Sequence, residues 1–128
     1  MLQALPSAWE LWIDGGHNAG AGLVVADFAT EQWGDAPLHL ICGMLTTKAA
    51  DDYLRPLANI ARSFTAVPIL SSDTGFTPDD LAATARGIGM TNVHTALSAD
   101  HALSELVARD QSRRVRVLIC GSLYLAGD

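Results

Sequence analysis

The sequence predicts an α/β domain in which a mostly parallel sheet is covered by helices on both faces. Strand-like and helix-like segments alternate along all 128 residues, and the turns between them are short. The last strand-like segment, residues 115–120, is largely apolar, as expected for a strand buried on both faces. We therefore expect a three-layer α-β-α arrangement with a sheet of five or six strands.

Five segments have the length and composition of β-strands, namely residues 10–14, 38–42, 64–69, 93–97 and 115–120. The apolar density of residues 115–120 predicts a central strand, with residues 38–42 beside it. Pro68 lacks a backbone donor, so the third segment should lie at an edge of the sheet, or the proline at the end of its strand.

Four segments have helical character, namely residues 20–33, 50–61, 78–88 and 99–110. The last has an apolar stripe at helical spacing, formed by Ala102, Leu103, Leu106 and Val107. Thr77 precedes Pro78 and is predicted to cap the third helix, with the proline in the first helical position. Ser98 is predicted to cap the fourth helix in the same way.

The composition excludes several classes of protein. The formal net charge of −6 argues against sequence-independent binding of nucleic acid. No apolar run approaches the roughly 20 residues of a membrane span, and the N-terminus lacks the basic and apolar regions of a signal peptide. We expect a soluble cytoplasmic protein. Cys42 and Cys120 have no metal-binding spacing, so we expect buried free thiols.

The turn after the first strand carries the clearest candidates for chemistry. Asp14 ends that strand, where a carboxylate can accept hydrogen bonds from ribose hydroxyls or from N–H groups of its own turn. His17 can donate to a phosphate or carboxylate, or it can cap the helix that follows. The Gly-x-Gly-x-x-Gly spacing of dinucleotide sites is absent, since His17 stands where the close-packing glycine belongs.

Two further candidates also follow strands. Lys48 is the only lysine of the chain, and its ammonium group can meet a phosphate or a substrate carboxylate. Ser122 offers a hydroxyl at the start of a helix-like segment, which suits a carboxylate ligand and also suits a simple N-cap. Because Asp14, Lys48 and Ser122 all follow strands, we expect them to lie along one edge of the sheet.

Three motifs give the chain a resemblance to a known family. The run Asp-Gly-Gly-His-Asn at residues 14–18 resembles the Asp-Gly-Ala-His-Asn signature of the C-terminal domain of Mur ligases. The run Gly-Ser-Leu-Tyr at residues 121–124 is similar to the ending of folylpolyglutamate synthase/dihydrofolate synthase. Residues 43–48 resemble that family's Gly-x-x-x-Asp-Lys-Asp loop, although Thr47 and Ala49 replace both aspartates.

The resemblance implies a Rossmann-like C-terminal domain of an ATP-dependent C–N ligase. Such an enzyme joins L-glutamate to dihydropteroate or folate through an acyl phosphate and releases ADP and phosphate. The resemblance implies nucleotide contacts by Asp14 and His17. It implies contacts to glutamate or the other substrate by His17, Ser122 and Lys48, although the missing aspartates weaken the role of Lys48.

The resemblance also implies that the ATP-binding phosphate loop and the Mg²⁺ ligands lie in an N-terminal P-loop domain. The chain has no Gly-x-x-x-x-Gly-Lys-Ser/Thr run. We therefore expect residues 1–128 to be one domain excised from a larger ligase, with Met1 an added start. We expect it to be monomeric, to contain no metal site, and to be inactive alone. The alternative is a stand-alone nucleotide or small-anion binding module without catalysis.

Overall fold

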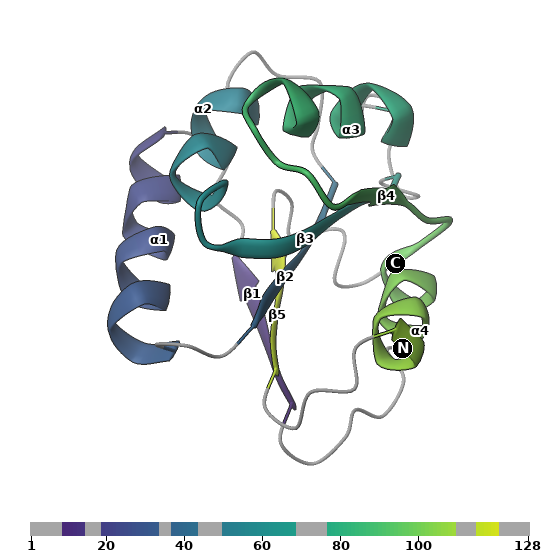
Figure 1. The fold of residues 1–128 in the computed structure, drawn as a ribbon, viewed down its shortest axis with the longest axis horizontal. Coiled ribbons are helices and arrows are strands. Elements are labelled where there is room, and N and C mark those ends of the chain that lie inside the picture. The colour runs from purple at the N-terminus through teal and green to yellow at the C-terminus, as the bar shows by residue number, and fades with distance from the viewer. Residues whose placement is uncertain are drawn as a thin grey trace.

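The computed structural model describes residues 9–14, 19–33, 37–43, 50–68, 77–109 and 115–120. They include one five-stranded sheet with the strand order β1-β5-β2-β3-β4 (Figure 1). The strands are β1 (Trp9–Asp14), β2 (Leu38–Cys42), β3 (Ala61–Ala66), β4 (Val93–Thr95) and β5 (Val115–Cys120). Every neighbouring pair is parallel. The predicted α/β class is confirmed, and β5 is central with β2 beside it, as expected.

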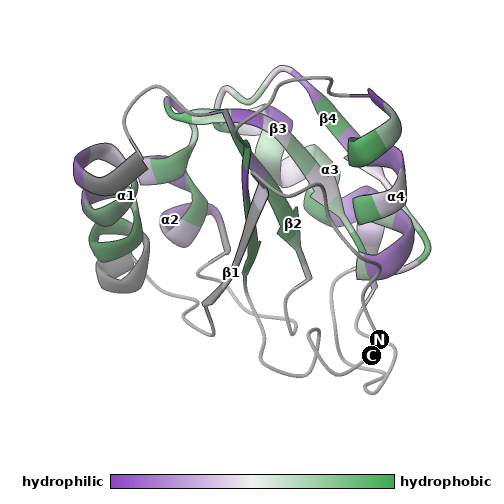
Figure 2. Ribbon diagram, turned by 90° about the horizontal axis from the view of Figure 1, so that it is seen from below, coloured by the Kyte–Doolittle hydropathy of each residue, from purple (hydrophilic) through white to green (hydrophobic). Residues whose placement is uncertain are grey.

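Helices cover the two faces of the sheet unequally. One face is covered by α1 (Ala19–Trp33), α2 (Ala50–Leu54), the 3₁₀ helix η1 (Arg55–Leu57) and α3 (Pro78–Gly87). The opposite face is covered by α4 (Ala99–Arg109). Figure 2 shows α1 and α2 on one side of the sheet and α4 on the other. The predicted three layers are therefore present in the described residues.

The central strand β5 shows why its sequence is apolar at every position but Arg116. Leu118 and Cys120 belong to the core under α1, α2 and α3. Val117 and Ile119 belong to the core under α4. Successive side chains of a strand point to opposite faces, so a strand covered on both sides needs apolar residues at nearly every position.

The second helical segment differs from the prediction of one helix over residues 50–61. The α-helix ends at Leu54 and continues only as η1. Pro56 has no N–H to donate within an α-helix, and its ring disfavours helical geometry at Arg55, so the helix breaks here. The strand that follows begins at Ala61 and ends at Ala66, earlier than the predicted 64–69.

Pro68 lies beyond the end of β3, which confirms that it stands at a strand end. It does not make β3 an edge strand, because β3 pairs with both β2 and β4. The strand predicted at residues 93–97 is also shorter and ends at Thr95. Ala96 then donates to the carbonyl of Ala66 at 3.0 Å as the chain leaves the sheet.

Both predicted helix caps are confirmed. The Thr77 hydroxyl accepts a hydrogen bond from the Asp80 N–H at 3.2 Å at the start of α3. The Ser98 hydroxyl accepts one from the His101 N–H at 3.1 Å at the start of α4. Each bond satisfies a backbone donor that has no partner within the helix. Among the described helices, none has the length and apolar character needed to cross a membrane.

Candidate functional site

The carboxyl ends of three neighbouring strands are aligned at one edge of the sheet. Asp14, the last residue of β1, is in register with Cys120, the last residue of β5. Cys120 is in turn in register with Cys42, the last residue of β2. The Gly43 N–H donates to the Cys120 carbonyl at 3.3 Å. The last residues of β1, β5 and β2 therefore lie side by side.

These three strand ends are the ones that precede the predicted site residues. Asp14 itself ends β1, and the structure describes its backbone pairing. His17, Lys48 and Ser122 lie outside the described residues, as do the side-chain contacts of Asp14. The structure thus brings together the strands that lead to the predicted site residues, and the positions of those side chains remain predictions.

Cys42 and Cys120 are the buried last residues of β2 and β5 at this edge. Both are free thiols without solvent exposure, which confirms the prediction made for them. A hydrogen bond with the Cys120 thiol raises the pKa of Cys42, and burial and the charge of a Cys120 thiolate raise it further. A thiol with a raised pKa is a weak nucleophile. We therefore assign this pair to packing between β2 and β5.

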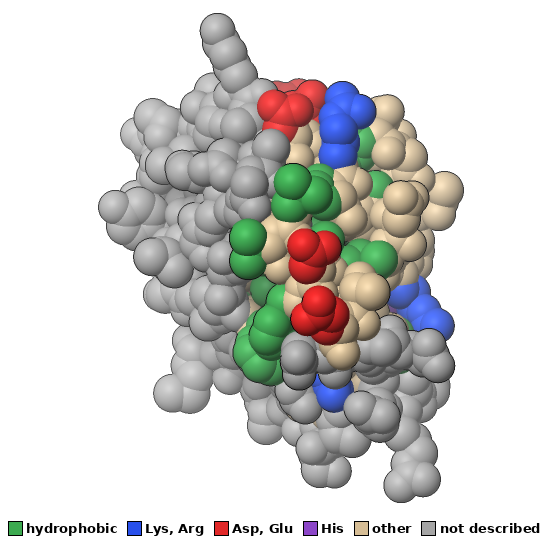
Figure 3. All heavy atoms as spheres, turned by 90° about the vertical axis from the view of Figure 1, so that its left-hand side faces the viewer, with side chains coloured by type: hydrophobic (Ala, Val, Ile, Leu, Met, Phe, Trp, Pro, Cys, Tyr) green, Lys and Arg blue, Asp and Glu red, His purple; other side chains and the backbone are tan. Residues whose placement is uncertain are grey.

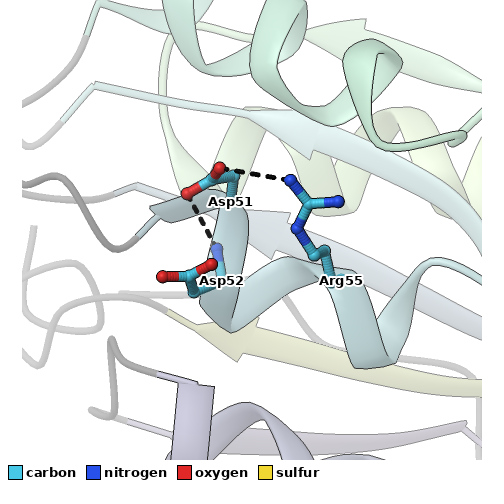
Figure 4. Close-up of polar contacts among 3 residues, drawn as sticks. All are labelled: Asp51, Asp52 and Arg55. Atoms are coloured by element: carbon cyan, nitrogen blue, oxygen red, sulfur yellow. Dashed lines mark hydrogen bonds and ion pairs between the residues drawn. The ribbon is translucent and has the colours of Figure 1, made fainter.

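Helix α2 and the start of η1 carry a small group of charges, shown in Figure 4. A carboxylate oxygen of Asp51 lies 3.5 Å from the Arg55 guanidinium, one helical turn away. The other oxygen accepts from the Asp52 N–H at 2.9 Å. The pair is exposed, and exposed ion pairs contribute little to stability. Its main effect is that the negative charge of Asp51 offsets the positive charge of Arg55.

A hollow that the sequence did not indicate lies at the other end of the same edge. It has a volume of about 360 Å³ and is lined by Pro78, Asp79, Thr95, Ala96, Leu97, His101 and Glu105. It forms where the chain changes face, since β3 leads to α3 on one face and β4 leads to α4 on the other. A reversal of this kind is the only signal that could have indicated it.

The remaining described histidines have local partners. His39 is buried and hydrogen-bonded to the Ser63 hydroxyl. The His94 ring lies 2.7 Å from the side-chain oxygen of Asn92. Within the described part of the chain, no three His, Cys, Asp or Glu side chains gather closely enough to hold a metal ion.

Comparison with known proteins places this geometry in a family. Residues 3–128 match the family described as dihydrofolate synthetase, C-terminal domain. No curated protein sequence matches the chain at a significant level. Three solved structures show the same fold, and all are less than 25% identical to the chain.

The first is Mycobacterium tuberculosis folylpolyglutamate synthase complexed with ADP, with a TM-score of 0.76, 23% identity, and coverage of 91% of this chain and 28% of that one. The second is E. coli FolC in complex with DHPP and ADP, with a TM-score of 0.75, 21% identity, and coverage of 88% and 26%. The third is the bifunctional folylpolyglutamate synthase/dihydrofolate synthase of Yersinia pestis complexed with AMPPNP and Mn ion, with a TM-score of 0.72, 19% identity, and coverage of 90% and 26%. The chain thus spans little more than a quarter of the length of each.

Proposed function

This chain belongs to the dihydrofolate synthetase C-terminal domain family, and from that premise we propose that it forms the C-terminal part of an ADP-forming amide ligase. The ligase would join L-glutamate to dihydropteroate or to a folate. It would be a cytoplasmic monomer in which a larger N-terminal P-loop domain precedes this one. The structurally similar enzymes bound to ADP, AMPPCP, AMPPNP and DHPP support a nucleotide and a pterin compound as ligands of the whole protein.

The observation that carries the proposal is the alignment of Asp14, Cys120 and Cys42 across β1, β5 and β2. Three motifs that are far apart in the sequence begin at Asp14 or directly after Cys42 and Cys120. In parallel α/β sheets, ligands bind outside the carboxyl ends of the strands. The register therefore supports one shared site made by residues 14–18, 43–48 and 121–124.

Asp14 and His17 are proposed to face the nucleotide. Asp14 would accept hydrogen bonds from the ribose hydroxyls at the end of β1. His17 would lie between the nucleotide and the incoming amino acid, where an imidazole can donate to a phosphate or carboxylate oxygen. In these roles both side chains bind and orient substrates.

Ser122 and Lys48 are proposed to face the glutamate. Ser122 follows the central strand at the point where a helix would begin, and free N–H groups there favour a carboxylate. Lys48 would supply a mobile positive charge for the same carboxylate. Because Thr47 and Ala49 replace the aspartates of the related loop, its contribution should be the smallest of the four.

The proposed reaction has two steps. The γ-phosphoryl group of ATP is transferred to a carboxylate of the pteroate or folate, and ADP leaves. The amine of glutamate then attacks the acyl carbon, the C–N bond forms as the nitrogen gives up a proton to solvent, and phosphate leaves with the C–O bond electrons. Mg²⁺ would offset the charge on the phosphate groups, and we expect its ligands to belong to the N-terminal domain. Residues of this chain would hold the ribose and the glutamate in line for these steps.

The isolated chain should bind MgATP too weakly to detect at micromolar concentration. Association costs several kcal/mol of lost freedom, roughly 4 or more, and two or three exposed polar contacts do not offset that. Calorimetry of the 128-residue chain with MgATP measures this directly. Micromolar binding would instead favour the stand-alone nucleotide-binding module.

The test of the proposal is turnover by the longer protein that contains this chain. ADP and phosphate release would be measured with and without L-glutamate, first with dihydropteroate and then with tetrahydrofolate. Glutamate-dependent release with either acceptor is the expected result, and the two acceptors distinguish the two activities. A protein that binds ATP but shows no glutamate-dependent release with either acceptor would contradict the proposal.

A further inference from the structure

Helix α1 exposes several large apolar side chains to solvent, although Val25 of the same helix is partly buried against the core. Leu23 and Val24 are 55% and 69% exposed, and Phe28 is also exposed. The buried positions of the same helix are held by Ala26 and Ala29. A helix that packs only on its own sheet normally shows the reverse arrangement, with large apolar residues inside and polar residues outside.

The exposed surface continues onto the outermost described strand. Trp12 of β1 packs against Phe28 in an edge-to-face arrangement, with ring centroids 5.3 Å apart, and both rings remain partly exposed. We call Trp12, Leu23, Val24 and Phe28 the α1 patch. Among the large hydrophobic residues that are exposed in the described part of the chain, the one outside this patch is Leu97. Contiguous apolar surface of this kind is typical of an interface.

The charged residues that α1 itself places around the patch are all acidic. Asp27 and Glu31 are exposed on α1, and the helix contains no lysine or arginine. Figure 3 shows hydrophobic and acidic side chains together on the face of the molecule where α1 lies, with basic side chains toward the margins of that face. A complementary surface would have an apolar centre and a basic rim.

The position of the α1 patch indicates what covers it. Helix α1 begins directly after residues 15–18, and Leu23 lies about 6 Å further along the helix axis, at 1.5 Å per residue. The patch therefore starts within two turns of the candidate site. Similar enzymes are more than three times as long as this chain, which covers 26–28% of each. A larger domain that completes the site at this edge would come within reach of the patch.

We propose that the α1 patch is the surface on which the N-terminal P-loop domain of the same polypeptide docks, through an apolar area rimmed by lysine and arginine. The inference rests on the proposed function for the existence of that domain. It adds that contact between the domains extends from the site loops along the outer face of α1.

The first experiment is hydroxyl-radical footprinting of the 128-residue chain and of the longer protein. Leu23, Phe28 and Trp12 should be oxidised several-fold more slowly in the longer protein, while Leu97 should be oxidised equally in both. Equal oxidation of the patch in both proteins would overturn the inference. The readout does not depend on catalysis, so a protected patch in a protein without glutamate-dependent turnover would support docking and contradict only the proposed reaction.

The second experiment compares the double variant L23E/V24E with the matched control L97E. In the longer protein the double variant should lower kcat/KM for MgATP by at least about tenfold, as expected when an interface centre is disrupted. L97E should have no such effect, and neither change should shift the Tm of the 128-residue chain by more than a few degrees. Equal kinetics for the two variants would overturn the inference. So would a 128-residue chain that sediments as a dimer and becomes monomeric on L23E/V24E, because the patch would then bind a second copy.

Discussion

At the β1–β5–β2 end of the sheet, β5 and β2 are buried along their whole length, and their last residues are aligned with Asp14. At the β3–β4 end, β4 has three residues, and the segment after it carries the exposed Leu97 beside a hollow. Both ends belong to the same carboxyl edge. The proposed site therefore lies at aligned strand ends, whereas the hollow is lined by α3, α4 and the segment after β4.

The largest expected difference between the two ends is in catalysis. Asp14→Ala and His17→Ala in the longer protein should each lower kcat/KM by about 30-fold to several thousand-fold, because losing a positioned charged contact in a closed site costs about 2–5 kcal/mol. Their Tm should stay within a few degrees, since we expect both residues to lie at a turn. Steady-state kinetics and thermal melts measure the two quantities.

The matched controls are Asp79→Ala and His101→Ala at the hollow. They should change kcat/KM by no more than about twofold, the size of an ordinary surface effect. Equal losses at the two ends would remove the distinction between them. Unchanged activity with a lowered Tm in the Asp14 and His17 variants would show that these residues stabilise the fold and do not bind substrates.

A second contrast is in stability. Ile119 of β5 has no exposed surface, and Ile119→Ala should lower the free energy of unfolding by about 2–5 kcal/mol. Leu97 is 73% exposed, and Leu97→Ala should change it by about 0.5 kcal/mol or less. Chemical denaturation of the 128-residue chain gives both values. Similar losses for the two variants would mean that the segment after β4 packs more tightly than its exposure indicates.

The β3–β4 end depends on its helix caps for local order. Thr77→Ala and Ser98→Ala should each lower the free energy of unfolding by about 1 kcal/mol, because each leaves a helix N-terminal N–H without its partner. Thr91→Ala is the control, since Thr91 is exposed between α3 and β4 in the same half of the molecule. Denaturation midpoints that do not separate the cap variants from the control would argue against capping.

The smallest expected effect is a pH dependence at β4. Burial lowers the pKa of His94 from 6.5, Arg109 and Arg86 lower it further, and Glu105 partly opposes them. The unfolded chain therefore binds this proton more readily, so His94 costs stability as the pH falls below about 6.5 and has no effect well above it. His94→Gln should reduce the drop in Tm between neutral pH and about pH 5. A larger drop in the variant would reverse the sign of the shift.

The sequence predicts the strands β2 and β5 more accurately than the helix and strand that follow β2 in the sequence. Residues 38–42 and 115–120 form strands with the predicted bounds, because each is an apolar run that ends at a glycine. The prediction of one helix over residues 50–61 was wrong. Pro56 ends the α-helix through a local effect, and the apolar pattern of the segment gives no sign of this break. The strand after it was displaced for the same reason.

The position of the candidate site at one edge of the sheet was predictable from the sequence, and the hollow was not. Asp14 and Ser122 each follow a strand, and parallel pairing places the ends of those strands together whatever the exact register. The hollow depends on how α3, the end of β4 and α4 come together, and no local pattern encodes contacts among residues so far apart. The same holds for the outward position of Leu23 and Val24, since an apolar helix gives no indication of which side will be buried.

The most direct test is a crystal structure of the longer protein with ADP and L-glutamate. We expect the ADP ribose to lie within hydrogen-bond distance of Asp14 and the glutamate carboxylate to lie beside Ser122, at the ends of β1 and β5. Nucleotide or glutamate bound in the hollow near Asp79 and His101, with Asp14 far from either ligand, would contradict the proposed site.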